Sequence, residues 1–419
     1  MKKIILCAFL LLSLLFTACV NSAEHTLSGA EKENPSGTVP VARDLSWIIT
    51  NGTLTIEGHG AIPDFGYDSV SPWDAEKDKI TRVFISNGIT RIGDKAFYYC
   101  DNLSYVSIPE SVTSIGDHAF RYCKKLATVQ IPKQVTSIGD YAFGECWSLE
   151  SIAIYQNVEY IGTAAFSNCK ALREISVEST NQHYSSENGI LFNKDKTALI
   201  RYPTEGGKKA YSIPESVTVI ETGAFESCSN LEHVVIPSSV TTIGNFAFSG
   251  CFNLTSLFIP RSITEIGWDA FDHCYELTQI DVDVSNPNYA SENGFFLSKD
   301  RKTLRLYPLG RSIDEISLPE SVTKIGGGAF ECNDKLVSFS VPQGVTAIEA
   351  WAFWSCDRLE TVWIPDSVTF IGANAFDCCE SLKTITFNGT KAQWESIKKE
   401  NFSGNSFTVS CTDGNVQVN

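Results

Sequence analysis

The segment that decides the fold is Ile115 to Leu126, IGDHAFRYCKKL, because its pattern recurs ten times along the chain. Most copies of its Ala-Phe pair lie 23 residues apart. A period between about 20 and 50 residues is typical of stacked units that cannot bury their apolar faces alone. The sequence therefore predicts a solenoid. The Ala-Phe pairs lie at 96/97, 119/120, 142/143, 165/166, 224/225, 247/248, 270/271, 329/330, 352/353 and 375/376.

Each repeat predicts two short strands and a turn. In residues 103–123, apolar residues alternate over 106–108, which indicates a strand with one buried face. Pro109 ends this strand because proline has no amide hydrogen to donate to a ladder. A second extended piece ends at Ile115. Asp117 then predicts the N-cap of a single helical or 3-10 turn that points the Ala-Phe pair inward.

Nine of the fourteen cysteines lie three residues after a repeat Phe. Free Cys is among the most buried residue types, so we interpret these positions as a structural ladder of buried thiols. Disulfides between coils about 4.8 Å apart are the geometric alternative. No Cys/His spacing predicts a zinc site. The ladder consists of Cys100, Cys123, Cys146, Cys169, Cys228, Cys251, Cys274, Cys356 and Cys379.

The repeat L-x-x-V-x-I-P-x-S-V-T-x-I-G-x-x-A-F-x-x-C resembles the BspA-type leucine-rich repeat of bacterial surface proteins, over residues 81–387. The resemblance implies a leucine-rich repeat solenoid, formally of the α/β repeat class but rich in β-structure. It also implies adhesion to host matrix proteins or to other cells. A fold does not locate a site, so the residues that bind must be argued separately.

The N-terminal residues have the pattern of an export signal. Lys2 and Lys3 precede an apolar run too short to span a bilayer, and residues 1–19 end at Cys19, where a bacterial lipobox places the lipidated residue. We expect a lipid-anchored protein of the cell envelope, exposed at the surface, or a secreted protein if Cys19 is not lipidated. Residues 20–43 are polar and lack a period, as in a flexible tether.

The repeats are flanked by two predicted caps. Residues 44–80 contain two alternating runs joined by Asn51-Gly52, a strong hairpin signal, and indicate an N-terminal cap. Residues 388–419 indicate a C-terminal cap with a short amphipathic helix that carries Trp394 and Ile397 as apolar anchors. A solenoid needs such caps because its terminal coils would otherwise expose core and strand edges.

Two intervals of 59 residues interrupt the rhythm, one after Phe166 and one after Phe271. They contain similar segments, about 178–211 and 283–316, which align at an offset of 105 residues. Apolar runs separated by polar residues predict a hairpin inserted into the solenoid in each segment. The sequence is compatible with a purely structural role of the inserts and with a role in binding.

The composition argues for a binding protein without catalytic chemistry. The net charge of −16 becomes −18 once Lys2 and Lys3 are removed with the signal, which argues against nucleic-acid partners. The six histidines form no paired motif, and we expect no catalytic residues, cofactor or metal. Asp281, Asp283, Ser285 and Glu292 mimic a calcium loop, but Asn286 stands where such a loop needs Gly, so we interpret them as a solvated loop.

The best candidates for binding lie on the strands. The middle residue of each V-x-I motif should point away from the core, and most of these residues are small and polar. Phe84, Phe258 and Trp363 are large exceptions, and Tyr105 and His233 lie on the same type of strand. Exposed aromatic residues on a rigid face are typical anchors for partners, so we expect binding of host or bacterial surface proteins. Glycan capture, a scaffold of the cell envelope, and packing of these rings on neighbouring elements are the alternatives.

Overall fold

The structure is a computed structural model that describes residues 36–39, 42–66, 69–311, 316–400 and 407–418, with side chains from residue 44 onward. Cys19 and the predicted signal lie outside the described residues. The chain forms two compact units. The larger unit contains Asn34–Lys299 and Pro308–Arg311, and the C-terminal unit contains Asp300–Tyr307 and Ser312–Asn419. Each is described by itself.

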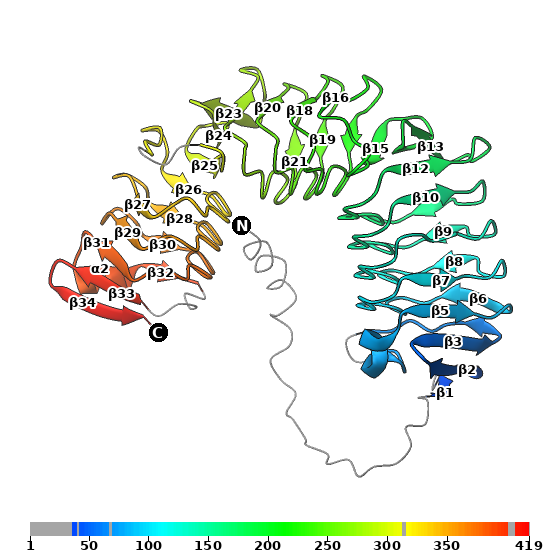
Figure 1. The fold of residues 1–419 in the computed structure, drawn as a ribbon. Helices are drawn as coiled ribbons and strands as arrows, with labels where there is room; N and C mark the ends of the chain where they lie inside the picture. The colour runs from blue at the N-terminus through cyan, green and yellow to red at the C-terminus, as the bar shows by residue number, and fades with distance from the viewer. Residues whose placement is uncertain (1–35, 40–41, 67–68, 312–315, 401–406, 419) are drawn as a thin grey trace, which may run out of the picture. The chain divides into compact units, whose positions relative to one another are not determined.

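In the larger unit most coils contribute a long strand, which carries the V-x-I motif, and a short strand that ends before the Ala-Phe turn (Figure 1). In the coil of residues 126–131 the long strand is reduced to an isolated bridge between Thr128 and Ser151. Equivalent strands of successive coils pair in parallel register, for example Val83 with Val106 and Ile115 with Ile138. The long strands are β5 (Arg82–Ile85), β7 (Tyr105–Ser107), β10 (Ser151–Ile154), β12 (Glu174–Val177), β16 (Ala210–Ser212), β18 (His233–Val235), β20 (Ser256–Ile259) and β22 (Gln279–Val282). The short strands are β4 (Gly60–Ala61), β6 (Ile89–Ile92), β8 (Ser114–Ile115), β9 (Ser137–Ile138), β11 (Tyr160–Ile161), β15 (Ala198–Arg201), β17 (Val219–Ile220), β19 (Thr242–Ile243) and β21 (Glu265–Ile266).

The C-terminal unit repeats this arrangement. Its long strands are β27 (Ser338–Ser340), β29 (Thr361–Ile364) and β31 (Thr384–Phe387). Its short strands are β25 (Thr303–Leu306), β26 (Lys324–Ile325), β28 (Ala347–Ile348), β30 (Phe370–Ile371) and β32 (Lys398–Lys399). The predicted leucine-rich repeat solenoid of stacked parallel strands is thus confirmed.

The turn around each Ala-Phe pair differs from the predicted helical turn. Alternate amides bond within the coil, as Tyr98 N–H does to the Lys95 carbonyl, while Lys95, Phe97 and Tyr99 donate to carbonyls of the next coil. In each of the ten turns, two residues four positions apart have positive φ, for example Lys95 at 54° and Tyr99 at 60°. A right-handed helix excludes that conformation. The described repeats contain turns in place of the expected helices.

The predicted N-cap aspartates bond between coils. The Asp94 carboxylate accepts the amide of Asp117 at 3.0 Å, and the Asp117 carboxylate accepts the amide of Asp140 at 2.8 Å. Asp140 in turn accepts the amide of Thr163 at 2.7 Å. Each carboxylate thus accepts a backbone amide from the turn of the next coil. This row of hydrogen bonds fixes the spacing of neighbouring coils.

The core of each unit is a column of stacked aromatic rings. Phe97, Phe120, Phe143 and Phe166 follow one another with centroid separations of 5.1, 5.3 and 6.0 Å. All four rings are buried, and at its N-terminal end the column continues into Trp73, whose ring stacks on Phe97 at 5.8 Å. Burial of this many apolar side chains is the main stabilising contribution to a stack of small coils.

The caps at the two ends cover the first and last coils. At the N-terminal end, β2 (Ala42–Thr50) pairs with β1 (Ser36–Val39) and, across the Asn51-Gly52 turn, with β3 (Thr53–Gly58), and a 3-10 helix η1 (Asp74–Lys79) follows Trp73. At the C-terminal end, helix α2 (Lys391–Ser396) begins with a capping box between Thr390 and Gln393 and buries Trp394. Strands β33 (Phe407–Cys411) and β34 (Gly414–Val418) close the sheet.

The first insert contains three strands, whereas the sequence predicted a hairpin of two. β13 (Tyr184–Glu187) and β14 (Ile190–Asn193) form a hairpin around Asn188-Gly189, both of which have positive φ. β14 then pairs with β15, which is also the short strand of a coil because it pairs in parallel with β17. In the second insert, β23 (Tyr289–Glu292) and β24 (Phe295–Ser298) form the equivalent hairpin.

The first long interval contains an additional coil that lacks the Ala-Phe pair. Tyr202 lies 23 residues before Phe225, and the two rings are tilted with their centroids 5.0 Å apart. The Tyr202 amide donates to the Ala224 carbonyl, as the amide of Phe225 does to the Ala247 carbonyl of the next coil. Tyr202 is therefore the Phe of a degenerate coil, and in the C-terminal unit Tyr307 has the same relation to Phe330 at 5.0 Å.

One buried asparagine holds each insert in place. The Asn286 side chain is fully buried, donates to the Pro260 and Ile263 carbonyls at 2.8 and 2.9 Å, and accepts two amides, from Asn288 and Tyr289. Asn181 makes the corresponding four bonds in the first insert. The insert thereby satisfies backbone groups inside the preceding coil.

We expect Asn286→Ala to lower the free energy of unfolding by about 2–4 kcal/mol, since it leaves several buried backbone groups without partners. Urea unfolding followed by circular dichroism measures the change. Asn253→Ala is the matched control, because the Asn253 side chain makes one exposed bond, to the Ser229 carbonyl at 2.7 Å. Equal effects of the two substitutions would contradict the anchoring role of Asn286.

Candidate binding surface

The long strands place their outward residues in straight rows. Within the larger unit, Phe84 pairs with Thr55 and Ser107, and Phe258 pairs with Asp281. Burial alternates along the strands, as in β5, where Val83 and Ile85 are buried and Phe84 is 37% exposed. Because backbone pairing fixes every coil, these outward side chains form a preorganised surface, which we call the strand face.

The strand face has a first aromatic patch near the N-terminal cap. The rings of Phe84 and Tyr105 lie 5.6 Å apart between centroids, and the Arg82 guanidinium lies 5.6 Å from the Tyr105 ring centre. Tyr105 is 41% exposed. Two residues that the sequence singled out separately thus meet on neighbouring strands.

A second patch lies on β16, β18, β20 and β22. Val235 and Phe258 are 60% and 53% exposed, and the exposed His233 lies on the same strand as Val235. The His233 Nδ1 atom lies 3.4 Å from the Thr255 hydroxyl. The structure therefore gathers His233 and Phe258 on one sheet and adds Val235, whose unremarkable side chain carried no signal in the sequence.

Trp363 lies in the C-terminal unit. It projects from β29 at 44% exposure, between Ser340 of β27 and Thr386 of β31. Its ring stands among small polar residues and does not join an aromatic patch of the kind seen around Phe84.

The ladder cysteines lie inside the coils. From Cys123 onward, each thiol donates to the carbonyl of the aromatic residue 26 positions earlier, as Cys251 does to Phe225 at 3.2 Å and Cys228 to Tyr202 at 3.8 Å. Burial raises the pKa of the ladder thiols from Cys100 to Cys356, to about 12 for Cys228. Within the described part of the chain the ladder cysteines are free thiols that stabilise the backbone.

An aromatic and cationic cluster on the turns was not predicted from the sequence. Tyr99 and Tyr122 stack at 4.2 Å, and the Arg121 guanidinium lies 4.5 Å from the Tyr141 ring centre. His118 stacks on Tyr141 at 5.3 Å, and burial together with the Arg121 charge lowers the pKa of His118 to about 4. The rings cover one another, so this cluster rigidifies the turns. The 23-residue offsets between these residues were the available signal.

A buried polar network follows on the next turns. Glu145 is 4% exposed and accepts bonds from Trp147 Nε1 at 3.0 Å and Asn168 Nδ2 at 2.5 Å. Arg201 is 2% exposed and donates to the Gly223 carbonyl at 2.6 Å. Burial raises the pKa of the half-buried Glu226 to about 7, and the Glu145 charge adds to this effect while Arg201 opposes it.

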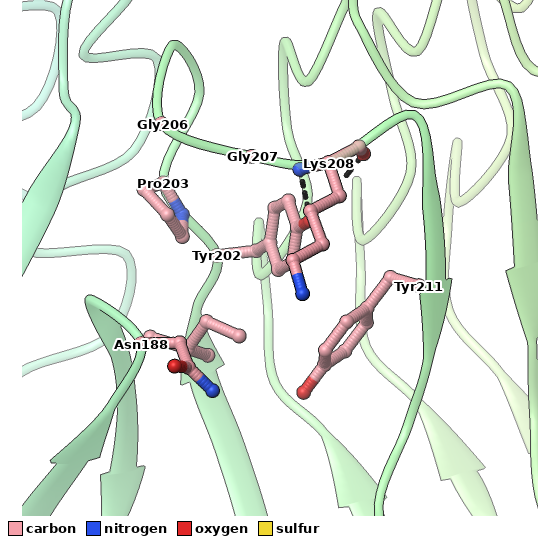
Figure 2. A pocket seen from close by; sticks show the side chains of 8 residues that line it. Asn188, Tyr202, Pro203, Gly206, Gly207, Lys208 and Tyr211 are labelled. Atoms are coloured by element: carbon pink, nitrogen blue, oxygen red, sulfur yellow. Dashed lines mark hydrogen bonds between the residues drawn. The ribbon is translucent and has the colours of Figure 1, made fainter.

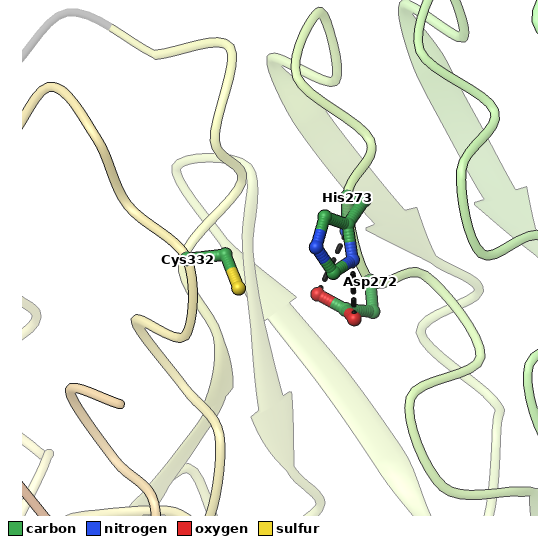
Figure 3. A group of neighbouring side chains, drawn as sticks. All are labelled: Asp272, His273 and Cys332. Atoms are coloured by element: carbon green, nitrogen blue, oxygen red, sulfur yellow. Dashed lines mark hydrogen bonds and ion pairs between the residues drawn. The ribbon is translucent and has the colours of Figure 1, made fainter. Parts of the chain in front are cut away.

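His273 stands beside an acid, as Figure 3 shows. Its Nδ1 atom lies 2.5 Å from the Asp272 carboxylate. Burial alone would lower the pKa of His273, but Asp272 and then Asp269 raise it above its ordinary value. The contact with Asp272 thus favours the protonated imidazole, and protonation removes the lone pair with which a histidine binds a metal. Cys332, also drawn in Figure 3, belongs to the C-terminal unit, where its amide donates to the Trp354 carbonyl.

The loop that mimics a calcium site is organised by hydrogen bonds of its own. Asp283 accepts the Ser285 amide at 2.8 Å, and Asp281 accepts the Gln279 side chain at 2.9 Å. Asn286 turns into the coil and cannot serve the loop. In the described residues, no helix is long and apolar enough to cross a membrane.

The BspA type leucine rich repeat family matches residues 75–190, 208–306 and 309–414 in six copies. These ranges cover more than half of the chain, which therefore belongs to this family, as its repeat indicated. No match was found among the curated proteins.

Two solved structures are similar. A leucine-rich repeat protein from Eubacterium ventriosum is 26% identical, with a TM-score of 0.55 over 91% of this chain and 100% of its own. A leucine rich cell surface protein from Faecalibacterium prausnitzii is also 26% identical, with a TM-score of 0.39 over 88% of this chain and 100% of its own.

We expect Glu226→Gln to change how stability depends on pH. Because the folded pKa of about 7 exceeds the ordinary value of 4.5, the stabilising effect of protonated Glu226 is full below pH 4.5 and is lost as the pH rises through 7. The variant should therefore melt at a higher temperature than the wild type at pH 8, with a smaller difference at pH 5. Thermal melts at both pH values measure this.

The control for this experiment is Glu232→Gln. Glu232 lies at the surface, where its hydrogen bond to Lys209 lowers its pKa. Glu232→Gln should not raise the melting temperature at pH 8. A Glu226→Gln difference that is the same at both pH values would show that Glu226 does not titrate in this range.

Proposed function

We propose that this protein is a non-catalytic binding protein of the bacterial cell surface, and that its strand face recognises other proteins in an adhesin-like manner. The observation that carries the proposal is the pair of exposed apolar patches, Phe84 with Tyr105 and Val235 with Phe258, on sheets whose backbone is fixed by pairing. Rigid aromatic anchors lose little conformational entropy on binding and are enriched at the centres of interfaces.

The distribution of the patches favours an extended macromolecule. Phe84 is on β5 and Phe258 is on β20, and the outward residues between them are mostly small and polar. A protein partner can span such separated anchors, whereas a sugar ring needs its stacking platform and its polar contacts close together. The charge of the mature chain, −18, favours a partner with a basic surface.

Glycan capture is the second candidate. It rests on Trp363, which stands 44% exposed between the hydroxyl-bearing Ser340 and Thr386. An aromatic face with adjacent hydrogen-bonding groups is the arrangement that stacks on a sugar. A scaffold of the cell envelope would use the same surfaces for a partner within its own envelope.

Binding to an array of matrix proteins and glycans tests the strand face, using purified residues 22–419. We expect saturable binding to a protein, with Kd raised about tenfold or more by Phe258→Ala/Trp363→Ala, as truncation of an interface anchor predicts. Tyr160→Ala is the matched control, because Tyr160 is 53% exposed but lies on the short strand β11. Binding to glycans alone would favour the second candidate, and no binding by the folded protein would refute recognition of these ligands.

Lipid attachment at Cys19 is a separate part of the proposal. Metabolic labelling with palmitate in a bacterial host should label the full-length chain and leave Cys19→Ser unlabelled, because the thiol of Cys19 is the acceptor. Cys7→Ser is the control, since Cys7 lies within the predicted signal. Release of an unlabelled wild-type chain into the medium would show that the protein is secreted without an anchor.

A further inference from the structure

A small hollow lies at the base of the first insert, away from the outward rows of the strand face. The segment 203–208 passes over Tyr202, and the hollow opens between this segment, the β13–β14 turn and β16 (Figure 2). Its free volume is about 50 Å³. That exceeds the roughly 10–15 Å³ that one water requires, so a small chemical group can enter.

The shape of the hollow is fixed by two glycines and a tyrosine. A Cβ atom at Gly206 would lie 2.0 Å from the Arg173 carbonyl, and one at Gly207 would lie 2.3 Å from the Tyr202 ring. The Tyr202 hydroxyl accepts the Lys208 amide at 2.7 Å and so holds the segment over the ring. The hollow is therefore preformed.

Three polar groups face the hollow. Figure 2 shows the Lys208 ammonium, the Asn188 amide and the Tyr211 hydroxyl at its rim. Within the described residues, the structure records no hydrogen bond or ion pair for these three side-chain ends. Burial raises the pKa of Tyr211 well above its ordinary value, so its hydroxyl remains a donor. The Glu187 carboxylate, whose charge adds to the raised pKa of Tyr211, forms an ion pair with Lys196.

The second insert carries different residues at the corresponding positions. Arg311 aligns with Gly206, and its guanidinium lies 4.5 Å from the Phe295 ring centre and donates to the Asn293 carbonyl at 2.7 Å. The residues aligned with Lys208 and Tyr211 are Ile313 and Ile316, so the sequence of the second insert lacks both polar groups. The glycine and the two donors are specific to the first insert.

We propose that the hollow of the first insert binds a carboxylate group carried at the end of a ligand. An ammonium, an amide N–H and a phenol O–H are donors to a carboxylate, and the charge-assisted bond from Lys208 is the strongest of the three. The walls formed by Tyr202, Pro203 and Ile190 accept the apolar part next to the carboxylate. Such a carboxylate can belong to an acidic sugar or to the C-terminus of a peptide.

Ligand-observed NMR titration of residues 22–419 tests the proposal with four probes: glucuronate, glucose, a tripeptide with a free C-terminus, and its C-terminal amide. We expect glucuronate, the free peptide or both to bind, and glucose and the amide not to bind. The probe that binds identifies the source of the carboxylate. Absence of binding by either carboxylate, or equal binding of the amide and the acid, would overturn the proposal.

Two substitutions locate the site. Lys208→Ile introduces the residue of the second insert and should raise Kd about tenfold or more, as loss of a charge-assisted hydrogen bond predicts. Tyr211→Phe keeps the ring, which lies 4.9 Å from Tyr202, and should weaken binding less. Lys209→Gln is the control, because Lys209 pairs with Glu232 at 2.6 Å. Unchanged binding in Lys208→Ile, with an unchanged melting temperature, would place the ligand elsewhere.

Discussion

The structure depends on the hydrogen bonds that join the Ala-Phe turn of one coil to the turn of the next. In seven of the ten turns three amides, such as those of His118, Phe120 and Tyr122, donate to the following coil. To direct them there, the backbone adopts a left-handed conformation at two residues in every repeat, mostly without glycine, as at Tyr141 and Glu145. Such residues cost roughly 1 kcal/mol each or more. The cost is tolerated because a buried amide without a partner would cost a similar amount or more, and because stacking buries the aromatic column at the same time.

This constraint explains why the surface is so regular. Once the turns are paired, the parallel register of the strands follows, and outward residues repeat at intervals of one coil. Function can then change through single outward side chains without any effect on the core. Phe258 and Ser212 belong to the same sheet, and both stand on outward positions, yet only Phe258 offers an anchor. Under the proposed function, a mutation at such a position would alter binding, while one at Phe248 or Cys251 would alter the fold, since both are buried.

The periodicity of the sequence predicted the solenoid and its buried positions. The prediction failed where one sequence pattern is compatible with two backbone geometries. The buried Phe and Cys positions follow from the spacing alone. The turn was predicted as helical because Gly116-Asp117 has the pattern of an N-cap before a helical turn. The bonds within the coil, such as Ala119 N–H to the Gly116 carbonyl, do have the spacing of a 3-10 helix, and only the neighbouring coil shows the difference. Asn188-Gly189 is a hairpin signal that the prediction from apolar runs did not include. The patch of His233, Val235 and Phe258 needed the register between strands, which no single repeat contains.

The two inserts show how this architecture acquires new chemistry. Both use a buried asparagine to satisfy the preceding coil, and both place a tyrosine hydroxyl on a strand amide, Tyr184 on Ile161 and Tyr289 on Ile266. These side chains bond to backbone groups, so the contacts hold the insert in place whatever residues its exposed positions carry. The two inserts differ at other positions, with Gly206 against Arg311 and Ile190 against Phe295. In the second insert the Arg311 guanidinium lies over the Phe295 ring and donates to the Asn293 carbonyl, whereas in the first insert the glycine leaves a hollow that Lys208 lines. The two inserts therefore share the residues that hold them in place and differ at the positions around the hollow. A duplicated structural element requires this division before one copy can acquire a ligand.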